Sequence, residues 1–342
     1  MKKESDFAKH LSSFLIRYLP GTLNVSKNTI SSYRDTYKLF LLFWQEEKKT
    51  RPEHLRLDMI TRESVSCFLD WLENSRRCCI STRNQRLAAI HSFIRYVQLE
   101  SPENLFELQK VLAIPMKKSL RPDIKFLTLK ETEILLAQPD TSTKAGRRNL
   151  VLLALMYDSG ARVQEIIDLT FQDVRLDAPS VVILRGKGNK TRSVPLLKNT
   201  ASLLKEYIAE QKSRYSPSSN DTTPLFQNQQ KQKLTRKGVA YILKKHAESA
   251  CMNSEFQRKE KITCHVLRHS RAAHMLQAGI PLVYIRDFLG HASVKSTEIY
   301  ARLNDEIKRK AIEEAYIDLN MQDFPSWQED AKLMDWLTDL CK

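Results

Sequence analysis

The sequence predicts a mainly α-helical protein with a small antiparallel sheet, divided into two domains. The chain has 342 residues, more than one domain usually holds. Apolar side chains recur at helical spacing through the first 110 residues and again after residue 128. A single pair of short apolar segments, residues 181–184 and 193–196, has the composition of two strands joined by a glycine-containing turn. These observations favour helical domains over a sandwich or a parallel α/β sheet.

The N-terminal domain, residues 1–111, is expected to be a small helical unit. Helices are predicted near residues 28–44, 59–72 and 81–97, because aromatic and aliphatic side chains repeat there every three or four positions. Core packing is the expected use of these aromatic side chains. Residues 112–127 then contain two prolines and several basic residues without an apolar period, which predicts a basic linker.

The second domain is expected to cover residues 128–303. Thr128 and Glu131 form a Thr-x-x-Glu capping box, which predicts the start of its first helix. The segment 213–233 is polar and aperiodic and is expected to be a loop. Further helices are predicted near residues 147–158, 163–169, 200–211 and 235–249, followed by two short helices that end at Gly279 and Gly290.

The last segment, residues 304–342, is predicted to carry a helix with an unpartnered apolar face. We expect this face to dock on a neighbouring protomer, and folding back onto its own domain is the alternative. The side chains that form it recur at helical spacing and are Phe324, Trp327, Ala331, Leu333, Met334, Trp336, Leu337, Leu340 and Cys341.

Composition excludes several classes of protein. No apolar run is long enough to span a membrane, and the N-terminus lacks the apolar core of a signal peptide, so we expect a cytoplasmic protein with no membrane partner. The six cysteines lack the spacing of a zinc site, which predicts free thiols and no metal. His265 and His269 have zinc-helix spacing, but Val266 stands where a metalloprotease needs glutamate.

The charge distribution predicts a polyanionic partner. The net charge is +15, yet residues from 305 onward contain ten acidic and only five basic side chains, so residues 1–304 carry +20. A basic body suggests binding to nucleic acid, and an acidic tail suggests binding to protein. Ribosomal and other RNA-binding proteins share this composition, so charge alone only narrows the class.

Six side chains of the second domain form a pattern that suits phosphate chemistry, namely Arg162, Lys187, His265, Arg268, His291 and Tyr300. The planar guanidinium of arginine donates two parallel hydrogen bonds to phosphate oxygens, so we expect Arg162 and Arg268 to clamp a phosphodiester. Tyr300 is the expected nucleophile and would form a phosphotyrosine.

The remaining groups are expected to move protons. A phenol with a pKa of about 10 needs neighbouring cations or a base, which His265 would supply. Lys187, in a hairpin turn, is the expected general acid for the leaving 5′ oxygen, and His291 would add a hydrogen bond to the phosphate. Each residue has a plainer reading: Arg162 could merely pair with Glu165, and Tyr300 could be a packing residue. Their joint occurrence favours a site.

From about residue 10 to residue 303 the chain resembles the tyrosine recombinases, the site-specific recombinases of the phage-integrase type. The resemblance rests on the order and spacing of the six residues, with 23 residues from Arg268 to His291 and nine from His291 to Tyr300. The segments that carry it are Gly-Ala-Arg-Val-Gln-Glu at 160–165, the glycine-lysine turn and strand at 186–196, His-Val-Leu-Arg-His at 265–269, Leu-Gly-His at 289–291 and Thr-Glu-Ile-Tyr at 297–300. None of the six departs from the family pattern.

The resemblance implies the fold and the reaction. Residues 1–111 would be a core-binding domain that clamps DNA, and residues 128–303 a catalytic domain of mixed α/β type. Arg162, Lys187, His265, Arg268 and His291 would activate the phosphate for attack by Tyr300, with Glu165 as an acidic supporter and His269 as a structural residue. Tyr300 would become joined to a 3′ phosphate, and neither ATP nor a metal ion would be needed.

The resemblance also implies the partners. These would be double-stranded DNA with specific recombination sites and other copies of the chain, which would form a tetramer on synapsed DNA and exchange strands through a Holliday junction. The free protein would be a monomer or weak oligomer in the cytoplasm, associated with the nucleoid, and accessory or paralogous recombinase subunits could join it. The residues expected to contact DNA are Thr82, Arg83, Asn84, Arg86, Lys117, Lys118, Lys190 and Arg192.

Several functions remain open from the sequence. The polar 213–233 segment and the long tail favour an integrase or transposase of a mobile element, and a chromosome-dimer-resolving recombinase is the alternative. A type IB topoisomerase-like enzyme would use similar chemistry without a partner site. A non-catalytic DNA-binding protein would explain the charge but would leave the six-residue pattern as coincidence.

Overall fold

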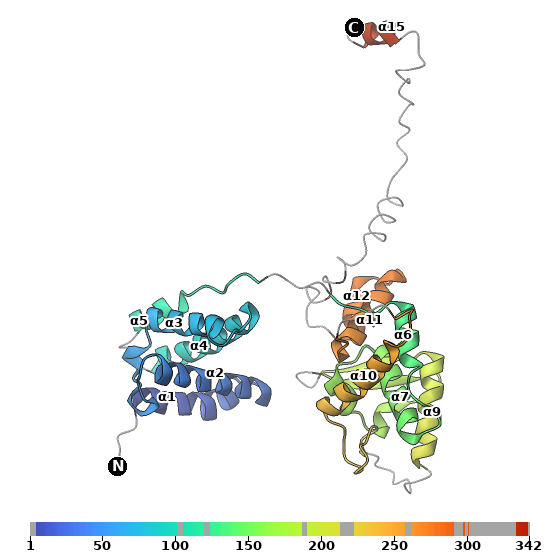
Figure 1. The fold of residues 1–342 in the computed structure, drawn as a ribbon, viewed down its shortest axis with the longest axis horizontal. Coiled ribbons are helices and arrows are strands. Elements are labelled where there is room, and N and C mark those ends of the chain that lie inside the picture. Colours follow the sequence, from blue (N-terminus) through green and yellow to red (C-terminus); the bar gives the residue numbers. More distant parts are fainter. Residues whose placement is uncertain are drawn as a thin grey trace. The chain divides into compact units, whose positions relative to one another are not determined.

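The computed structural model divides the chain into two compact units, Met1–Pro122 and Asp123–Lys342 (Figure 1). The structure describes residues 5–100, 105–119, 124–186, 190–212, 222–256, 261–290, 297, 300 and 333–340.

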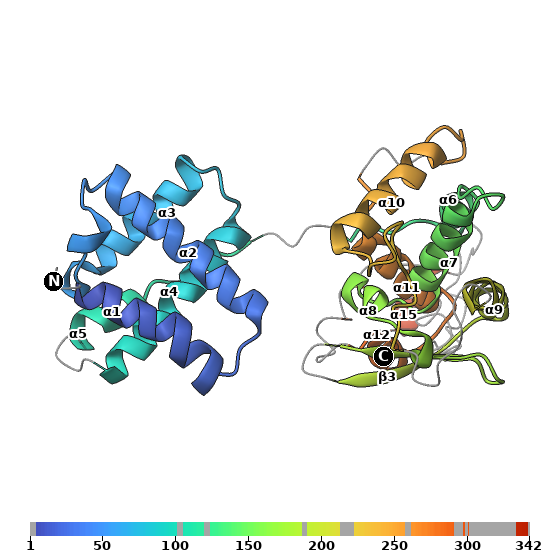
Figure 2. The same ribbon diagram turned by 90° about the horizontal axis from the view of Figure 1, so that it is seen from below.

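Helices are the only regular secondary structure in the described residues of the first unit. Its long helices begin at side-chain caps: Ser26 Oγ accepts the amide of Thr29 before α2, and Thr61 and Ser64 form a reciprocal capping box before α3. In chain order the elements are α1 (Asp6–Ser13), the π-helical η1 (Phe14–Thr22), α2 (Lys27–Glu46), the single turns η2 (Pro52–His54) and η3 (Leu57–Met59), α3 (Arg62–Asn74), α4 (Ile80–Glu100) and α5 (Leu105–Leu112) (Figures 1 and 2).

Aromatic rings form the core of the first unit. Phe14, Phe40, Phe68 and Phe93 are all at most 1% exposed. The ring centroids of Phe40 and Phe68 lie 5.0 Å apart, edge to face, and those of Phe14 and Phe93 lie 5.3 Å apart. These contacts join η1, α2, α3 and α4, which confirms that the aromatic periodicity marks core positions.

The second unit combines helices with a three-stranded antiparallel sheet, so the predicted fold class is confirmed. Its elements are α6 (Leu129–Leu136), α7 (Lys144–Asp158), α8 (Val163–Ile167), η5 (Phe171–Asp173), β1 (Val174–Arg175), β2 (Val181–Arg185), β3 (Thr191–Pro195), α9 (Lys198–Lys212), α10 (Arg236–Ala250), α11 (Cys264–Gln277), α12 (Leu282–Leu289) and the tail helix α15 (Leu333–Asp339) (Figure 1).

The sheet has the order β1-β2-β3. Val182 pairs with Val194, and Val182 and Leu184 of β2 are fully buried, because alternate residues of a strand point to the same face. The predicted strand pair is therefore correct, while the two-residue β1 was too short for a periodic signal. Isolated bridges Thr170–Pro224 and Gln227–Lys233 show that the described part of the predicted 213–233 loop is partly paired.

Two apolar clusters stabilise the second unit. The larger one joins α7, α9, α10 and the sheet through side chains such as Leu152, Leu184 and Leu243. A smaller cluster contains Tyr300 with side chains of α11 and α12. Within the described ranges, none of the helices is long and apolar enough to cross a membrane.

Candidate active site

The corner between α7 and α8 places Arg162. Ser159 ends α7 by donating to the carbonyl of Leu155, and Gly160 adopts a φ of +55° that turns the chain back. A Cβ atom at Gly160 would lie 2.9 Å from Leu289 Cδ2, so a larger residue would push against the end of α12. Arg162 follows as the N-cap residue of α8, where its side chain projects from the corner.

Arg268 of α11 lies beside Arg162 and is only 4% exposed. Its Nη1 donates to the carbonyl of Gly160 at 2.7 Å and its Nη2 to the carbonyl of Leu289 at 2.8 Å. The Nη2 of Arg162 donates to the next carbonyl, that of Gly290, at 3.1 Å. Because the two guanidinium groups bond to consecutive carbonyls, they lie side by side. The structure thus brings together the two arginines that the sequence assigned to a phosphate clamp.

Burial and the nearby charge of Arg162 lower the pKa of Arg268 to about 10. The guanidinium remains charged at neutral pH. Two adjacent cations that are partly removed from water repel each other, and a bound anion would relieve this repulsion. The pair therefore has the electrostatic character of an anion site.

Glu165 of α8 holds Arg162 in place. One of its oxygens accepts from Arg162 Nη1 at 2.8 Å, and the other accepts the backbone amide of Arg162 at 2.8 Å. Burial opposes ionisation of this carboxyl, but hydrogen bonds from Arg192 and Arg162 outweigh it, so the pKa of Glu165 is lowered. The carboxylate is buried, ionised and fixed, which is the geometry expected of an acidic supporter.

Arg192 of β3 completes this buried network. Its two terminal nitrogens donate to both oxygens of Glu165, at 3.0 and 2.8 Å, and its Nε donates to the carbonyl of Phe288. Its side chain is 13% exposed. Arg192 is predicted from the sequence to contact DNA, and in the structure its guanidinium links the sheet, α8 and α12. Lys190, two residues earlier, is exposed.

The phenol of Tyr300 is fully buried, and its hydroxyl contacts His269 of α11. The Oη–Nδ1 distance is 2.7 Å. Burial raises the pKa of Tyr300 to about 12, although the charge of Arg268 opposes this rise. Burial, followed by the charges of His265 and Arg268, lowers the pKa of His269 to about 4. Both groups are therefore neutral at pH 7.

The sequence predicts His265 as the base, and the family resemblance implies a structural role for His269. In the structure His265 is exposed on α11, with its ring centroid 6.3 Å from that of His269. Partial removal of the ring from water, followed by the charges of Arg268 and Arg162, lowers the pKa of His265. The signal for His269 was its position next to Arg268 and one turn after His265, but helical spacing could not say which ring Tyr300 reaches.

Lys187 and His291 lie outside the described residues. So do residues 304–332 of the predicted tail, and the described residues 333–340 include the short helix α15. The placement of these parts relative to Arg162, Arg268 and Tyr300 stays a prediction.

The predicted DNA contacts of the first unit need one correction. We expected exposed donors at the start of α4, but Arg83 is only 5% exposed. Its Nη1 donates to the carbonyl of Pro115 at 3.3 Å, and its Nε lies 3.4 Å from a carboxylate oxygen of Glu73. The expectation failed because the chain after α5 folds back over this side chain, a contact that helical periodicity does not reveal.

Asn84 also holds this returning segment, whereas Arg86 bonds to α2. Asn84 donates to the carbonyl of Lys117 at 2.8 Å and accepts its amide at 3.1 Å. Arg86 donates to the carbonyl of Ser32 and to Thr36. Half-buried Thr82 and exposed Lys118 complete the predicted set. Part of the predicted basic linker is therefore packed against the first unit.

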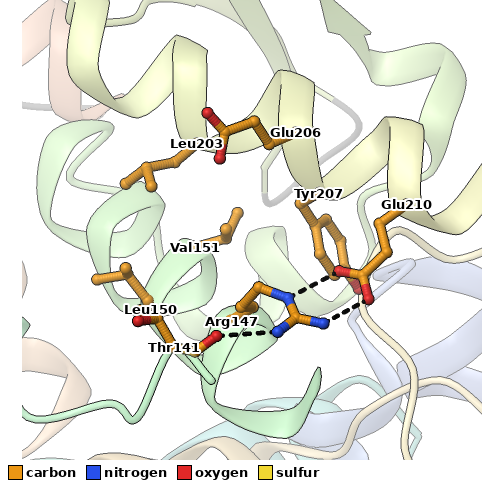
Figure 3. A pocket seen from close by; sticks show the side chains of 8 residues that line it. All are labelled: Thr141, Arg147, Leu150, Val151, Leu203, Glu206, Tyr207 and Glu210. Carbon is orange, nitrogen blue, oxygen red and sulfur yellow. Dashed lines mark hydrogen bonds and ion pairs between the residues drawn. The ribbon is translucent and has the colours of Figure 1, made fainter. Parts of the chain in front are cut away.

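A cavity of about 280 Å³ lies apart from these residues, between α7 and α9. Figure 3 shows Arg147 pointing across it to Glu210, with which it forms two hydrogen bonds of 3.1 and 2.8 Å. The cavity contains none of the predicted site residues. Its ion pair ties α9 to α7, which is a structural role.

Comparisons with known proteins agree on one family. The model of the phage integrase family matches residues 125–306, and the model of the phage integrase N-terminal SAM-like domain matches residues 13–101. The integrase/recombinase y4rC of Sinorhizobium fredii is 36% identical over 91% of this chain and 92% of its own length. The tyrosine recombinase XerC of Roseiflexus castenholzii is 32% identical over 85% of this chain and 88% of its own.

Solved structures share the fold. The Tn1549 transposon integrase in complex with transposon right-end DNA has a TM-score of 0.68 and 15% identity, covering 90% of this chain and 98% of that one. A lambda integrase tetramer bound to a Holliday junction has a TM-score of 0.62 and 16% identity, covering 85% and 76%. At these identities the likeness is one of architecture.

Proposed function

This chain belongs to the phage integrase family of tyrosine recombinases, and we propose that it cuts and rejoins DNA at specific sites through a 3′-phosphotyrosine on Tyr300. The observation that carries the proposal is the pair of guanidinium groups of Arg162 and Arg268, fixed on consecutive carbonyls close to the tyrosine. Paired arginines bind the oxygens of a phosphodiester and stabilise the charge that builds up in the transition state.

The residues divide the reaction between them. Attack of Tyr300 forms the bond from its phenolic oxygen to phosphorus and breaks the bond from phosphorus to the 5′ oxygen. His265 takes up the proton of the attacking phenol, Lys187 donates the proton that the 5′ oxygen takes up, and His291 donates a hydrogen bond to the phosphate. Glu165 keeps Arg162 in position through its hydrogen bonds. The phosphotyrosine keeps the energy of the broken phosphodiester bond. The 5′ hydroxyl of another strand can therefore reverse the attack.

The first unit is proposed to be the core-binding domain that clamps DNA. Lys118 and Lys190 are exposed and suited to phosphate contacts. We propose four parts of the chain: the core-binding domain at 1–111, the basic linker at 112–127, the catalytic domain at 128–303 and the tail at 304–342. The segment held by Asn84 and Arg83 would set where the linker leaves the first unit.

Assembly is proposed to be a tetramer on two DNA sites, by analogy with the lambda integrase tetramer on a Holliday junction. The tail, residues 304–342, would dock on a neighbouring protomer. Deleting residues 323–342 should leave DNA binding intact and abolish synapsis, measured by native gels with two labelled DNA sites. Normal assembly of the deleted chain would contradict docking between protomers.

We propose a mobile element as the host of this gene, and chromosome-dimer resolution is the second candidate. The y4rC relative favours the first role, and the XerC relatives favour the second. Sequencing of genomic DNA captured by a Tyr300→Phe variant separates them. Bound sites that flank the gene would support a mobile element, whereas one site far from the gene would support resolution.

Covalent trapping tests the catalytic proposal. A nicked suicide duplex built from a captured site would be incubated with wild type and with Tyr300→Phe, in the presence of a chelator. We expect a protein–DNA adduct from wild type alone on a denaturing gel, while both proteins bind the DNA. If wild type forms no adduct on any of the captured sites, the chain only binds DNA and does not cut it.

A further inference from the structure

The side chain of Tyr300 is enclosed within the second unit. Its exposed fraction is 0%, and it packs in a cluster with Ala272 and Met275 of α11 and Ile285 and Leu289 of α12. A phosphodiester of duplex DNA lies on a bulky polyanion and cannot enter this cluster. The tyrosine must therefore move out before it attacks.

One polar contact satisfies the buried hydroxyl. His269 Nδ1 lies 2.7 Å from Tyr300 Oη, and the two ring centroids are 5.6 Å apart. The imidazole is neutral at pH 7 and the phenol is protonated, so a hydrogen bond joins them in either tautomer: a ring with its hydrogen on Nδ1 donates to the phenolic oxygen, and a ring with its hydrogen on Nε2 accepts a hydrogen bond from the phenol at Nδ1. Without this partner, burial would leave the hydroxyl unsatisfied.

We propose that His269 is a positioning residue that holds Tyr300 inside the fold in a protonated resting state, and that breaking this bond releases the tyrosine. The proposal rests on the proposed function only in taking Tyr300 as the nucleophile. It differs from a base role for His269, because a base must still contact the hydroxyl during attack.

The contacts of Arg268 connect release to the substrate. Its Nη2 donates to the carbonyl of Leu289, whose side chain lies in the same cluster as Tyr300. A DNA phosphate offers this guanidinium charged acceptors, which form stronger hydrogen bonds than carbonyl oxygens do. Binding of the phosphate thus competes for the donor that fixes the end of α12, and loosening of that end would open the cluster around Tyr300.

The test measures how often Tyr300 becomes exposed in the full-length protein. The probe is acetylation by N-acetylimidazole, followed at each tyrosine by peptide mass spectrometry. Tyr241, which is 69% exposed, serves as the fast reference. Tyr207, which is 5% exposed in the core of the second unit, reports whether that unit stays folded.

Loss of the imidazole should expose the phenol. We expect Tyr300 to be acetylated about three- to tenfold faster in His269→Ala than in wild type, because one hydrogen bond is lost. His269→Gln, whose amide oxygen can accept the proton, should restore slow acetylation. His246→Ala removes another buried histidine with a side-chain partner, Asn149, and should leave Tyr300 unchanged. If acetylation of Tyr207 also rises in His269→Ala, His269→Leu, which fills the site without accepting, replaces it.

Two results would overturn the proposal. One is an equal rate of Tyr300 acetylation in wild type and in the variants without an acceptor. The other is adduct formation on the nicked duplex that falls about a hundredfold in His269→Ala while acetylation is unchanged, since that assigns a base to His269. If wild type forms no adduct at all, the proposed reaction fails, yet the acetylation rates still decide whether His269 holds Tyr300.

Discussion

At the scale of single residues, burial gives the two neighbouring histidines of α11 different surroundings. His265 is exposed. His269 lies against the buried phenol of Tyr300, and the charge of Arg268 and the potential charge of His265 both act on its ring. The same helix therefore presents one ring to solvent and one to the interior. Glu165 is an equally local device, since one buried carboxylate orients both Arg162 and Arg192.

The depressed pKa of His269 predicts a pH effect on stability. The folded protein resists protonation of this ring until pH about 4, whereas an unfolded histidine takes up its proton near pH 6.5. The free energy of unfolding should therefore fall as pH drops from 6.5 toward 4. Urea unfolding at pH 7 and pH 5 should show that wild type loses roughly 1–2 kcal/mol more than His269→Gln. Parallel losses in both proteins would contradict this.

Glu165→Gln should weaken the arginine network. The amide keeps one acceptor oxygen but loses the charge and the second acceptor, so roughly 1–3 kcal/mol of stability should be lost. Adduct formation on the nicked duplex should fall about tenfold or more, because Arg162 is no longer fixed. Glu206→Gln, at an exposed position on α9, is the matched control and should change the free energy of unfolding by less than about 0.5 kcal/mol. Equal stability and equal adduct formation in the two variants would contradict the idea that Glu165 fixes Arg162.

At the scale of elements, the ends of helices build the site. The corner after α7 supplies Arg162 and the carbonyl of Gly160, and the end of α12 supplies the carbonyls of Leu289 and Gly290. Both ends use glycines with positive φ. The positions of Arg162 and Arg268 therefore depend on how α7, α11 and α12 lie relative to one another. A shift of any one of these helices would displace the proposed phosphate clamp.

Substitutions at two glycines distinguish the effect of backbone strain from the effect of displacing the helix ends. Gly160→Ala places a methyl group in a left-handed conformation and against Leu289, whereas Gly279→Ala shares the positive φ but has no atom within 4 Å of the new Cβ. Both should lose roughly 1–2 kcal/mol of stability by urea unfolding. Only Gly160→Ala should also slow adduct formation, by about tenfold or more, because it displaces the carbonyls that hold Arg268. A similar slowing in Gly279→Ala would show that strain alone is responsible.

At the scale of the whole molecule, charge is distributed unevenly along the chain. The +20 of residues 1–304 predicts binding to DNA that depends on salt, because each neutralised phosphate releases counterions. The DNA affinity of Tyr300→Phe should fall about a thousandfold or more between 50 and 200 mM salt. Fluorescence anisotropy with a captured site measures this. A dissociation constant that stays constant over this range would contradict phosphate contacts as the main source of affinity.

The sequence by itself determined the fold class, the helical core of the first unit and the β2–β3 pair. Periodicity and capping residues act within one segment, so they can be read locally, as Thr61 and Thr128 illustrate. The order of Arg162, Arg268 and Tyr300 also identified the family, because their spacing is a property of the chain.

Only the tertiary structure decided which side chains are covered and by what. Arg83 looked like an exposed donor until the segment near Pro115 folded over it. His269 became the partner of Tyr300, and Arg192 the partner of Glu165, through contacts between residues at least 27 positions apart. Helical spacing assigns a residue to a face, but which distant segment packs on that face depends on the three-dimensional fold.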